Sequence, residues 1–185
     1  MQKTVKVLEK TLKQKSDGIS AVKKSPFWLG IYNTAKTLQK PFNFLNLKPK
    51  HFAEQLAIYE HHLYEQISAE EFIGQNWGAQ GERDKAQHLV QFSTHLTNAT
   101  TWYANQILDL STAKERADVI STLIYIMLLS FQLNNFLGTF EILFALNSLE
   151  IFRLSQTWSL VAEEKRRIVW IFTQFTGNMF KCYRS

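Results

Sequence analysis

The sequence predicts an all-α fold, an irregular multi-helix bundle, and three observations support this prediction. Only three prolines and seven glycines interrupt the 185 residues. Apolar residues recur at helical spacing over long stretches, and no segment has the pattern of a strand hairpin. A hydrophobic content of 45% is enough for one sizeable core. We therefore expect one domain with an N-terminal appendage.

Residues 1–50 are expected to form a basic N-terminal extension that is partly helical. They contain 11 lysines and 2 acidic residues, whereas residues 51–185 contain 10 basic and 14 acidic residues. Val5, Leu8 and Leu12 recur at helical spacing among lysines, which predicts a short basic amphipathic helix. One interpretation is a brace packed on the domain, and the other is an arm that binds an anionic membrane or an acidic partner.

Residues 51–185 are expected to form the helical domain, and several apolar stripes define its helices. The first three stripes run through Phe52, Leu56, Tyr59, Leu63 and Ile67, then Leu89, Phe92, Leu96, Ala99, Tyr103 and Ile107, then Ile120, Ile124, Met127 and Phe131. Two more run through Phe136, Phe140, Leu143 and Phe144, then Ile168, Val169, Phe172 and Phe175. Short loops between these stripes predict an irregular bundle.

Capping signals mark where some of these helices begin. Ser68 with Glu71, and Thr112 with Glu115, have the spacing of capping boxes. Asn134 and Asn135 interrupt an apolar run and predict a corner. That run, residues 119–140, has no charged residue, but its amides argue for a buried helix and a turn instead of a membrane span.

Nothing in the sequence points to catalysis of a covalent step. Asp84 and His88 stand four residues apart, yet two ligands do not make a metal site, and His61 and His62 point in different directions. We therefore expect no catalytic residue, no metal and no cofactor. Residues 51–185 carry no basic patch of the kind that binds nucleic acid, so no nucleic-acid partner is expected.

The single cysteine and the N-terminus indicate the compartment. Cys182 has no partner for an internal disulfide, which favours a reducing environment. The N-terminus has no apolar signal segment. We expect a cytoplasmic protein, with peripheral membrane attachment and delivery into another cell both left open.

A series of short motifs occurs in a recognisable order. It begins with Phe52-Ala53-Glu54-Gln55-Leu56 and Glu71-Phe72-Ile73-Gly74-Gln75-Asn76-Trp77, continues through Leu133-Asn134-Asn135-Phe136, Asn147-Ser148, Arg153-Leu154 and Thr157-Trp158, and ends with Phe180-Lys181-Cys182-Tyr183-Arg184-Ser185. In this order the chain resembles the catalytic domain of Ras guanine-nucleotide exchange factors. The family's domain continues beyond the last segment into a catalytic hairpin, so we expect residues 51–185 to be a truncated form of it.

This resemblance implies a Ras-like small GTPase as the partner. Family members hold the GTPase switch II region in the bowl of the helical core, while the hairpin opens switch I. The positions that correspond to GTPase contacts are Trp77, Ser93, Thr94, Thr97, Phe140, Asn147 and Phe180. Ser93 and Thr94 stand where some members have an apolar and a basic residue, and Thr97 stands where many have asparagine.

The expected function is therefore guanine-nucleotide exchange on a Ras-like GTPase, which makes or breaks no covalent bond. Two alternatives stay open. One is a catalytically inactive module that binds a GTPase and lacks the exchange hairpin. The other is a membrane-associated helical scaffold that depends on the basic extension.

Overall fold

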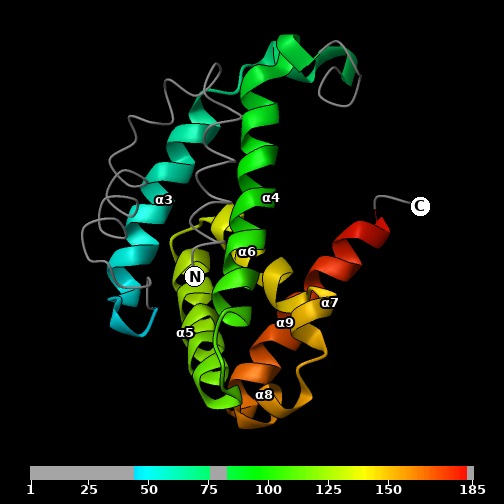
Figure 1. The fold of residues 1–185 in the computed structure, drawn as a ribbon. Helices are drawn as coiled ribbons and strands as arrows, with labels where there is room; N and C mark the ends of the chain where they lie inside the picture. The colour runs from blue at the N-terminus through cyan, green and yellow to red at the C-terminus, as the bar shows by residue number, and fades with distance from the viewer. Residues whose placement is uncertain (1–43, 76–82, 183–185) are drawn as a thin grey trace. The chain divides into compact units, whose positions relative to one another are not determined.

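The computed structural model describes residues 44–75 and 83–182, and every regular element in these two ranges is helical, which confirms the all-α prediction (Figure 1). The predicted basic helix and the aromatic clusters before residue 44 lie outside the described residues. The α-helices are α3 (Pro49–Glu65), α4 (Gln87–Leu108), α5 (Ala113–Gln132), α6 (Phe136–Asn147), α7 (Leu149–Phe152), α8 (Ser155–Leu160) and α9 (Glu163–Cys182). Short 3-10 helices are η2 (Phe44–Asn46), η3 (Ala69–Gln75) and η4 (Arg83–Ala86).

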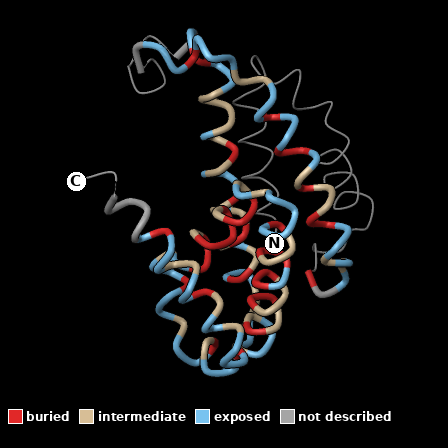
Figure 2. The backbone as a smooth tube through the Cα atoms, turned by 180° about the vertical axis from the view of Figure 1, so that it is seen from behind, coloured by how far each residue is buried: buried red, intermediate tan, exposed pale blue. Residues whose placement is uncertain are grey.

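Helices α5 and α6 form the centre of the described body. Helix α6 packs mainly on α4 and α5, and α3 packs mainly on α5. Figure 1 shows α3 on one side and α9 on the other, with α4 between them. Buried residues are concentrated in α5 and α6, whereas most residues of α7, α8 and α9 are exposed (Figure 2). The core is therefore made where four helices meet.

Both predicted signals around α5 are found in the structure. The Thr112 side chain accepts a hydrogen bond from the Glu115 N–H, and the Glu115 carboxylate accepts one from the Thr112 N–H. These reciprocal bonds satisfy two donors that a helix start leaves unpaired. At the other end, Asn134 adopts the left-handed conformation, with φ of 58°. Asn135 then caps α6, because its Oδ1 accepts from the Gly138 N–H.

The aromatic side chain of Phe44 joins the core although the sequence analysis placed it in the extension. It is 2% exposed and its ring lies 5.4 Å from the Trp102 ring and 6.0 Å from the Phe52 ring, measured between centroids. Such tilted and edge-on ring pairs contribute stability beyond the area they bury. Packing of the domain thus begins before residue 51.

Some predicted core positions are exposed. Phe131, Phe136 and Phe175 are each more than two-fifths exposed, although each belongs to a predicted apolar stripe. Phe131 instead packs edge-on against Phe136 and Phe172, with ring centroids 5.8 and 5.1 Å apart. Phe131, Phe136 and Phe172 form an aromatic cluster between helices near the surface, which apolar spacing alone does not distinguish from a core.

The charge-free run of residues 119–140 divides between α5 and α6, as its two asparagines predicted. Within the residues that the structure describes, no helix is both long enough and apolar enough to cross a membrane.

Candidate functional site

The predicted GTPase contacts that the structure describes lie on two helices packed against each other. Ser93, Thr94 and Thr97 lie on α4, and Phe140 and Asn147 lie on α6. Ser93 and Thr97 are exposed, and they stand two residues before and after the buried His95. Since two residues correspond to about 200° around a helix, both side chains point away from the core.

Two of the predicted contacts on α4 donate their side-chain hydrogen bonds within the helix. The Thr94 hydroxyl donates to the Val90 carbonyl at 2.7 Å, and the Thr97 hydroxyl donates to the Ser93 carbonyl at 3.1 Å. The surface that this part of α4 presents to a partner therefore consists largely of the Thr94 and Thr97 methyl groups and the Ser93 side chain. This surface is small and uncharged.

On α6 the predicted contacts are tied to neighbouring side chains. Phe140 is half-buried and its ring stacks on Phe144, with centroids 5.9 Å apart and planes 13° apart. The Asn147 Nδ2 donates to the Thr173 hydroxyl of α9 at 2.8 Å. Asn147 therefore links α6 to α9 in addition to being exposed.

Two of the predicted contacts lie outside the part of the chain whose side chains the structure describes. Trp77 lies outside the described residues. Phe180 lies in the last part of α9, and its side chain is outside the described part. The structure thus brings α4 and α6 together, while the sequence prediction for Trp77 and Phe180 stays a prediction.

Glu71 connects η3 to the start of α4. Its Oε1 lies 2.8 Å from His88 Nδ1 and accepts from the Ser68 N–H at 3.3 Å, while its Oε2 accepts from the Leu89 N–H at 2.9 Å. Burial acts to raise the pKa of Glu71, but these hydrogen bonds outweigh burial and lower the pKa below its ordinary value. One carboxylate therefore forms one half of the predicted box at Ser68, while the Glu71 N–H donates to the Ser68 backbone carbonyl instead of the Ser68 hydroxyl. The same carboxylate caps α4, which has no side-chain cap of its own.

His88 was weighed in the sequence as a metal ligand together with Asp84. The Asp84 side chain lies outside the described part, and the chain around it forms η4, so α4 begins only at Gln87. His88 contacts Glu71 instead.

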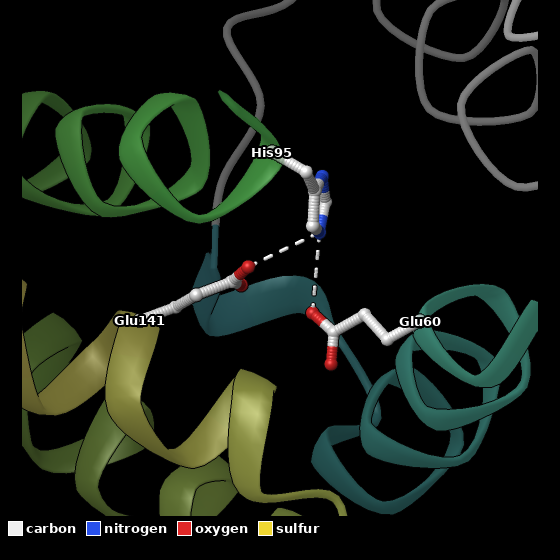
Figure 3. Close-up of side chains that lie close together, drawn as sticks. All are labelled: Glu60, His95 and Glu141. Carbon is white, nitrogen blue, oxygen red and sulfur yellow. Dashed lines mark hydrogen bonds and ion pairs between the residues drawn. The ribbon is translucent and has the colours of Figure 1, made fainter. Parts of the chain in front are cut away.

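A buried cluster of Glu60, His95 and Glu141 is the main arrangement that the sequence analysis missed. One residue comes from each of α3, α4 and α6, and the three side chains converge (Figure 3). His95 Nε2 lies 3.3 Å from Glu60 Oε1 and 3.1 Å from Glu141 Oε1. The Tyr59 ring packs edge-on against the imidazole, with centroids 5.2 Å apart.

The charges of this cluster strongly perturb one another. Burial alone would lower the pKa of His95, but the adjacent carboxylates of Glu141 and Glu60 raise it to about 9. Burial raises the pKa of Glu141 to about 8; His95 opposes this rise and repulsion from Glu60 adds to it. Burial also raises the pKa of Tyr103 well above 10, with a further contribution from the two carboxylates. His95, Glu141 and Tyr103 therefore retain protons at pH values where the same groups would release them in water.

The spacing of α4 contained a signal for this cluster. The buried residues of α4 are His95, Ala99, Tyr103 and Ile107, at strict intervals of four. The predicted apolar stripe contained Ala99, Tyr103 and Ile107, but it began with Leu89, Phe92 and Leu96, which are only half-buried, and it left out His95. That part of the prediction was wrong because a histidine paired with glutamates occupies the core-facing position.

Comparison with known proteins identifies the class to which this helical body belongs. The model of the RasGEF domain family matches residues 51–185. The chain therefore belongs to the RasGEF domain family, whose members do not catalyse covalent chemistry as enzymes do.

Individual relatives of the chain include proteins named as guanine-nucleotide exchange or releasing factors. The chain is 34% identical to Ras guanine nucleotide exchange factor E of Dictyostelium discoideum over 119 residues, which are 64% of this chain and 12% of that protein. It is 26% identical to the protein son of sevenless of Drosophila melanogaster over 141 residues, 76% of this chain and 9% of that protein. It is 28% identical to Ras-specific guanine nucleotide-releasing factor RalGPS1 of Danio rerio over 125 residues, 68% of this chain and 22% of that protein. The matched part of the chain thus spans only a small part of each relative.

Proposed function

We propose that this chain is a guanine-nucleotide exchange factor for a Ras-like small GTPase and that it binds the switch II region of that GTPase. The observation that carries the proposal is the match of residues 51–185 to the RasGEF domain family. The names of the relatives, all exchange or releasing factors or son of sevenless, support the same activity.

The physical basis of the activity is thermodynamic coupling. A protein that binds the nucleotide-free GTPase more tightly than the nucleotide-bound form must weaken nucleotide binding by the same factor. Such a protein needs surface complementarity and no reactive side chain. The uncharged surface of α4 around Ser93 and Thr97, with Phe140 and Asn147 on α6, supplies the described part of the proposed contact surface, and Trp77 and Phe180 complete it.

The test is the release of fluorescent GDP from a panel of Ras, Rap and Ral GTPases, with capture of the nucleotide-free GTPase measured in parallel. Accelerated release supports exchange activity. Capture without release would support the alternative of a GTPase-binding module without exchange activity. Neither release nor capture would refute both.

A pair of charge variants locates the surface. Thr97→Arg adds a cation at an exposed position of the proposed interface, and we expect it to reduce GTPase capture at least tenfold, which corresponds to about 1.4 kcal/mol. Ser159→Arg adds the same charge at an exposed position of α8 and serves as the matched control. Equal capture by both variants would remove α4 from the proposed interface.

We also propose a cytoplasmic location with peripheral attachment to anionic membranes through residues 1–50. The excess of lysine there supports it. Binding of the whole chain to phosphatidylserine vesicles should weaken as salt is raised. Absence of binding at low salt would refute the attachment.

A further inference from the structure

The buried cluster of Glu60, His95 and Glu141 has more ligand atoms than its hydrogen bonds use. Each side chain offers one atom of a type that binds metals, and these atoms all lie within 4.8 Å of one another. The carboxylates of Glu60 and Glu141 are 2% and 0% exposed, so water does not compete for them. Clusters of carboxylate and imidazole on a protein surface are common, but here all three side chains are buried.

Three of the four carboxylate oxygens lack a hydrogen-bond partner. They are Glu60 Oε2, Glu141 Oε1 and Glu141 Oε2. Glu141 Oε1 lies 3.1 Å from His95 Nε2, yet the geometry is not that of a hydrogen bond. The reason is chemical: a single imidazole nitrogen carries at most one proton and faces two carboxylates. Buried polar atoms without partners are rare in folded proteins and point to an unaccounted ligand.

We propose that Glu60, His95 and Glu141 form a binding site for one divalent transition-metal cation of the zinc class, which joins α3, α4 and α6. Such a cation accepts electron pairs from the imidazole nitrogen and from both carboxylates at once, which no single proton does. Two carboxylates balance its charge, so the buried site as a whole becomes neutral.

The distances between the ligand atoms agree with this assignment. Zinc binds imidazole nitrogen and carboxylate oxygen at about 2.0 to 2.2 Å, so neighbouring ligands of a tetrahedral site lie about 3.3 to 3.6 Å apart. The two separations from His95 Nε2, 3.3 and 3.1 Å, are close to this range. The two carboxylates repel each other in the absence of a cation and need only approach one another around it.

The mixed nitrogen and oxygen set selects the class of metal. Calcium and magnesium prefer oxygen ligands in larger numbers, whereas imidazole suits zinc and neighbouring first-row metals. Three protein residues leave a fourth position, which a second carboxylate oxygen can fill. Because the site is buried, its role is to hold the helices in place, including α4 with the proposed contacts Ser93 and Thr97.

The surroundings of the cluster leave room for this arrangement. A Cβ atom on Gly138 would lie 2.9 Å from Glu60 Oε2 and 2.8 Å from Asn135 Nδ2. The Asn135 Nδ2 is itself a buried donor without a partner. Glycine at position 138 therefore keeps the space beside Glu60 Oε2 and Asn135 Nδ2 free of a further side chain.

The experiment uses the whole chain, first treated with EDTA and then transferred to chelator-free buffer at neutral pH. Titration with zinc chloride in a calorimeter should show one tight equivalent, and the same addition should raise the thermal midpoint by several degrees. Cobalt chloride should give the strong visible absorption of a four-coordinate site. Zinc binding should weaken on acidification, because protons compete for the same ligands.

Two sets of variants assign the site. His95→Gln and Glu60→Gln should each lose the tight equivalent and the zinc-dependent rise in midpoint. His61→Gln removes an exposed histidine that lies 3.1 Å from Glu65, and it should keep both. Circular dichroism verifies that each variant is folded. If both cluster variants fail to fold, the stoichiometry and the cobalt spectrum of the unmodified chain decide the question.

The proposal is overturned if the unmodified chain binds no tight equivalent of zinc and its thermal midpoint does not change when zinc is added. In that case protons and hydrogen bonds alone stabilise the cluster. It is equally overturned if folded His95→Gln and Glu60→Gln still bind zinc, or if His61→Gln abolishes the binding. Neither result bears on the GTPase-binding proposal, which is read out by GDP release.

Discussion

Replacement of His95 by leucine measures how much the buried, protonated imidazole contributes to the free energy of unfolding. Leucine is similar in size, so the main change is that the buried side chains of Glu60 and Glu141 lose the positively charged imidazolium between them. The pKa of His95 rises from 6.5 to about 9 in the folded chain, and each pKa unit corresponds to about 1.4 kcal/mol, which gives about 3 kcal/mol. Removal of one partner from a buried ion pair typically costs about 3 to 5 kcal/mol. We expect a loss in this range for metal-free protein at neutral pH.

The matched control is His61→Leu. His61 and Glu65 stand 3.1 Å apart, as His95 and Glu141 do, but their side chains are 68% and 58% exposed, against 8% and 0%. Since exposed pairs contribute little, the control should change stability by less than about 0.5 kcal/mol.

Urea unfolding of both variants in EDTA measures the difference. The His95→Leu variant should regain stability as the pH falls toward 5, because burial raises the pKa of Glu141 and the folded chain therefore takes up a proton there more readily than the unfolded chain does. A cost below about 1 kcal/mol, or equal costs for His61→Leu and His95→Leu, would refute the reasoning that burial decides the strength of these pairs.

Further expectations concern pH, packing and caps. In metal-free protein, the raised pKa of His95 means that its stabilising contribution is complete below pH 6.5 and is lost as the pH rises through about 9. The free energy of unfolding should therefore fall between pH 6.5 and about 9. Urea unfolding at several pH values measures this fall. The raised pKa of Glu141 acts in the same direction. Gly138→Ala should destabilise the fold by about 1 to 3 kcal/mol in spite of the better helix propensity of alanine, since the new Cβ would press on buried side-chain atoms; a thermal midpoint equal to or above that of the unmodified chain would contradict this. Glu71→Gln should cost about 1 to 2 kcal/mol in urea unfolding, because one oxygen that accepts hydrogen bonds becomes a donor, and an unchanged midpoint would show that the cap is dispensable. Asn134→Gly should change stability by a few tenths of a kcal/mol at most while Asn134→Ala costs about 1 kcal/mol, and equal effects would argue against the left-handed turn.

Local signals allowed much of the fold to be predicted from sequence. The capping box at Thr112 and the corner at Asn134 depend on residues only a few positions apart, and both are present in the structure. Helix positions follow from apolar spacing for the same reason. The fate of Phe131 could not be predicted in this way, because its exposure depends on how far α6 and α9 cover it.

The buried cluster could not be predicted because its members are far apart in sequence. Glu60 and His95 are 35 residues apart, and Glu141 is on a third helix. A lone glutamate or histidine in a helix is usually exposed, and only the packing of α3, α4 and α6 brings these three together. The proposed GTPase contacts were predicted in a different way, from the resemblance to a family, and those that the structure describes lie on α4 and α6.

The carboxylate of Glu71 has a consequence for how the chain tolerates change. It fixes η3 to the first turn of α4, so the two ends of the segment between them are held together by the scaffold itself. The entropic penalty for joining two fixed points of a chain grows only slowly with the number of residues between them. Insertions, deletions and substitutions in residues 76–82 should therefore leave the neighbouring helices in place. Trp77 lies in this segment, so a proposed partner contact sits where sequence can diversify without loss of the fold.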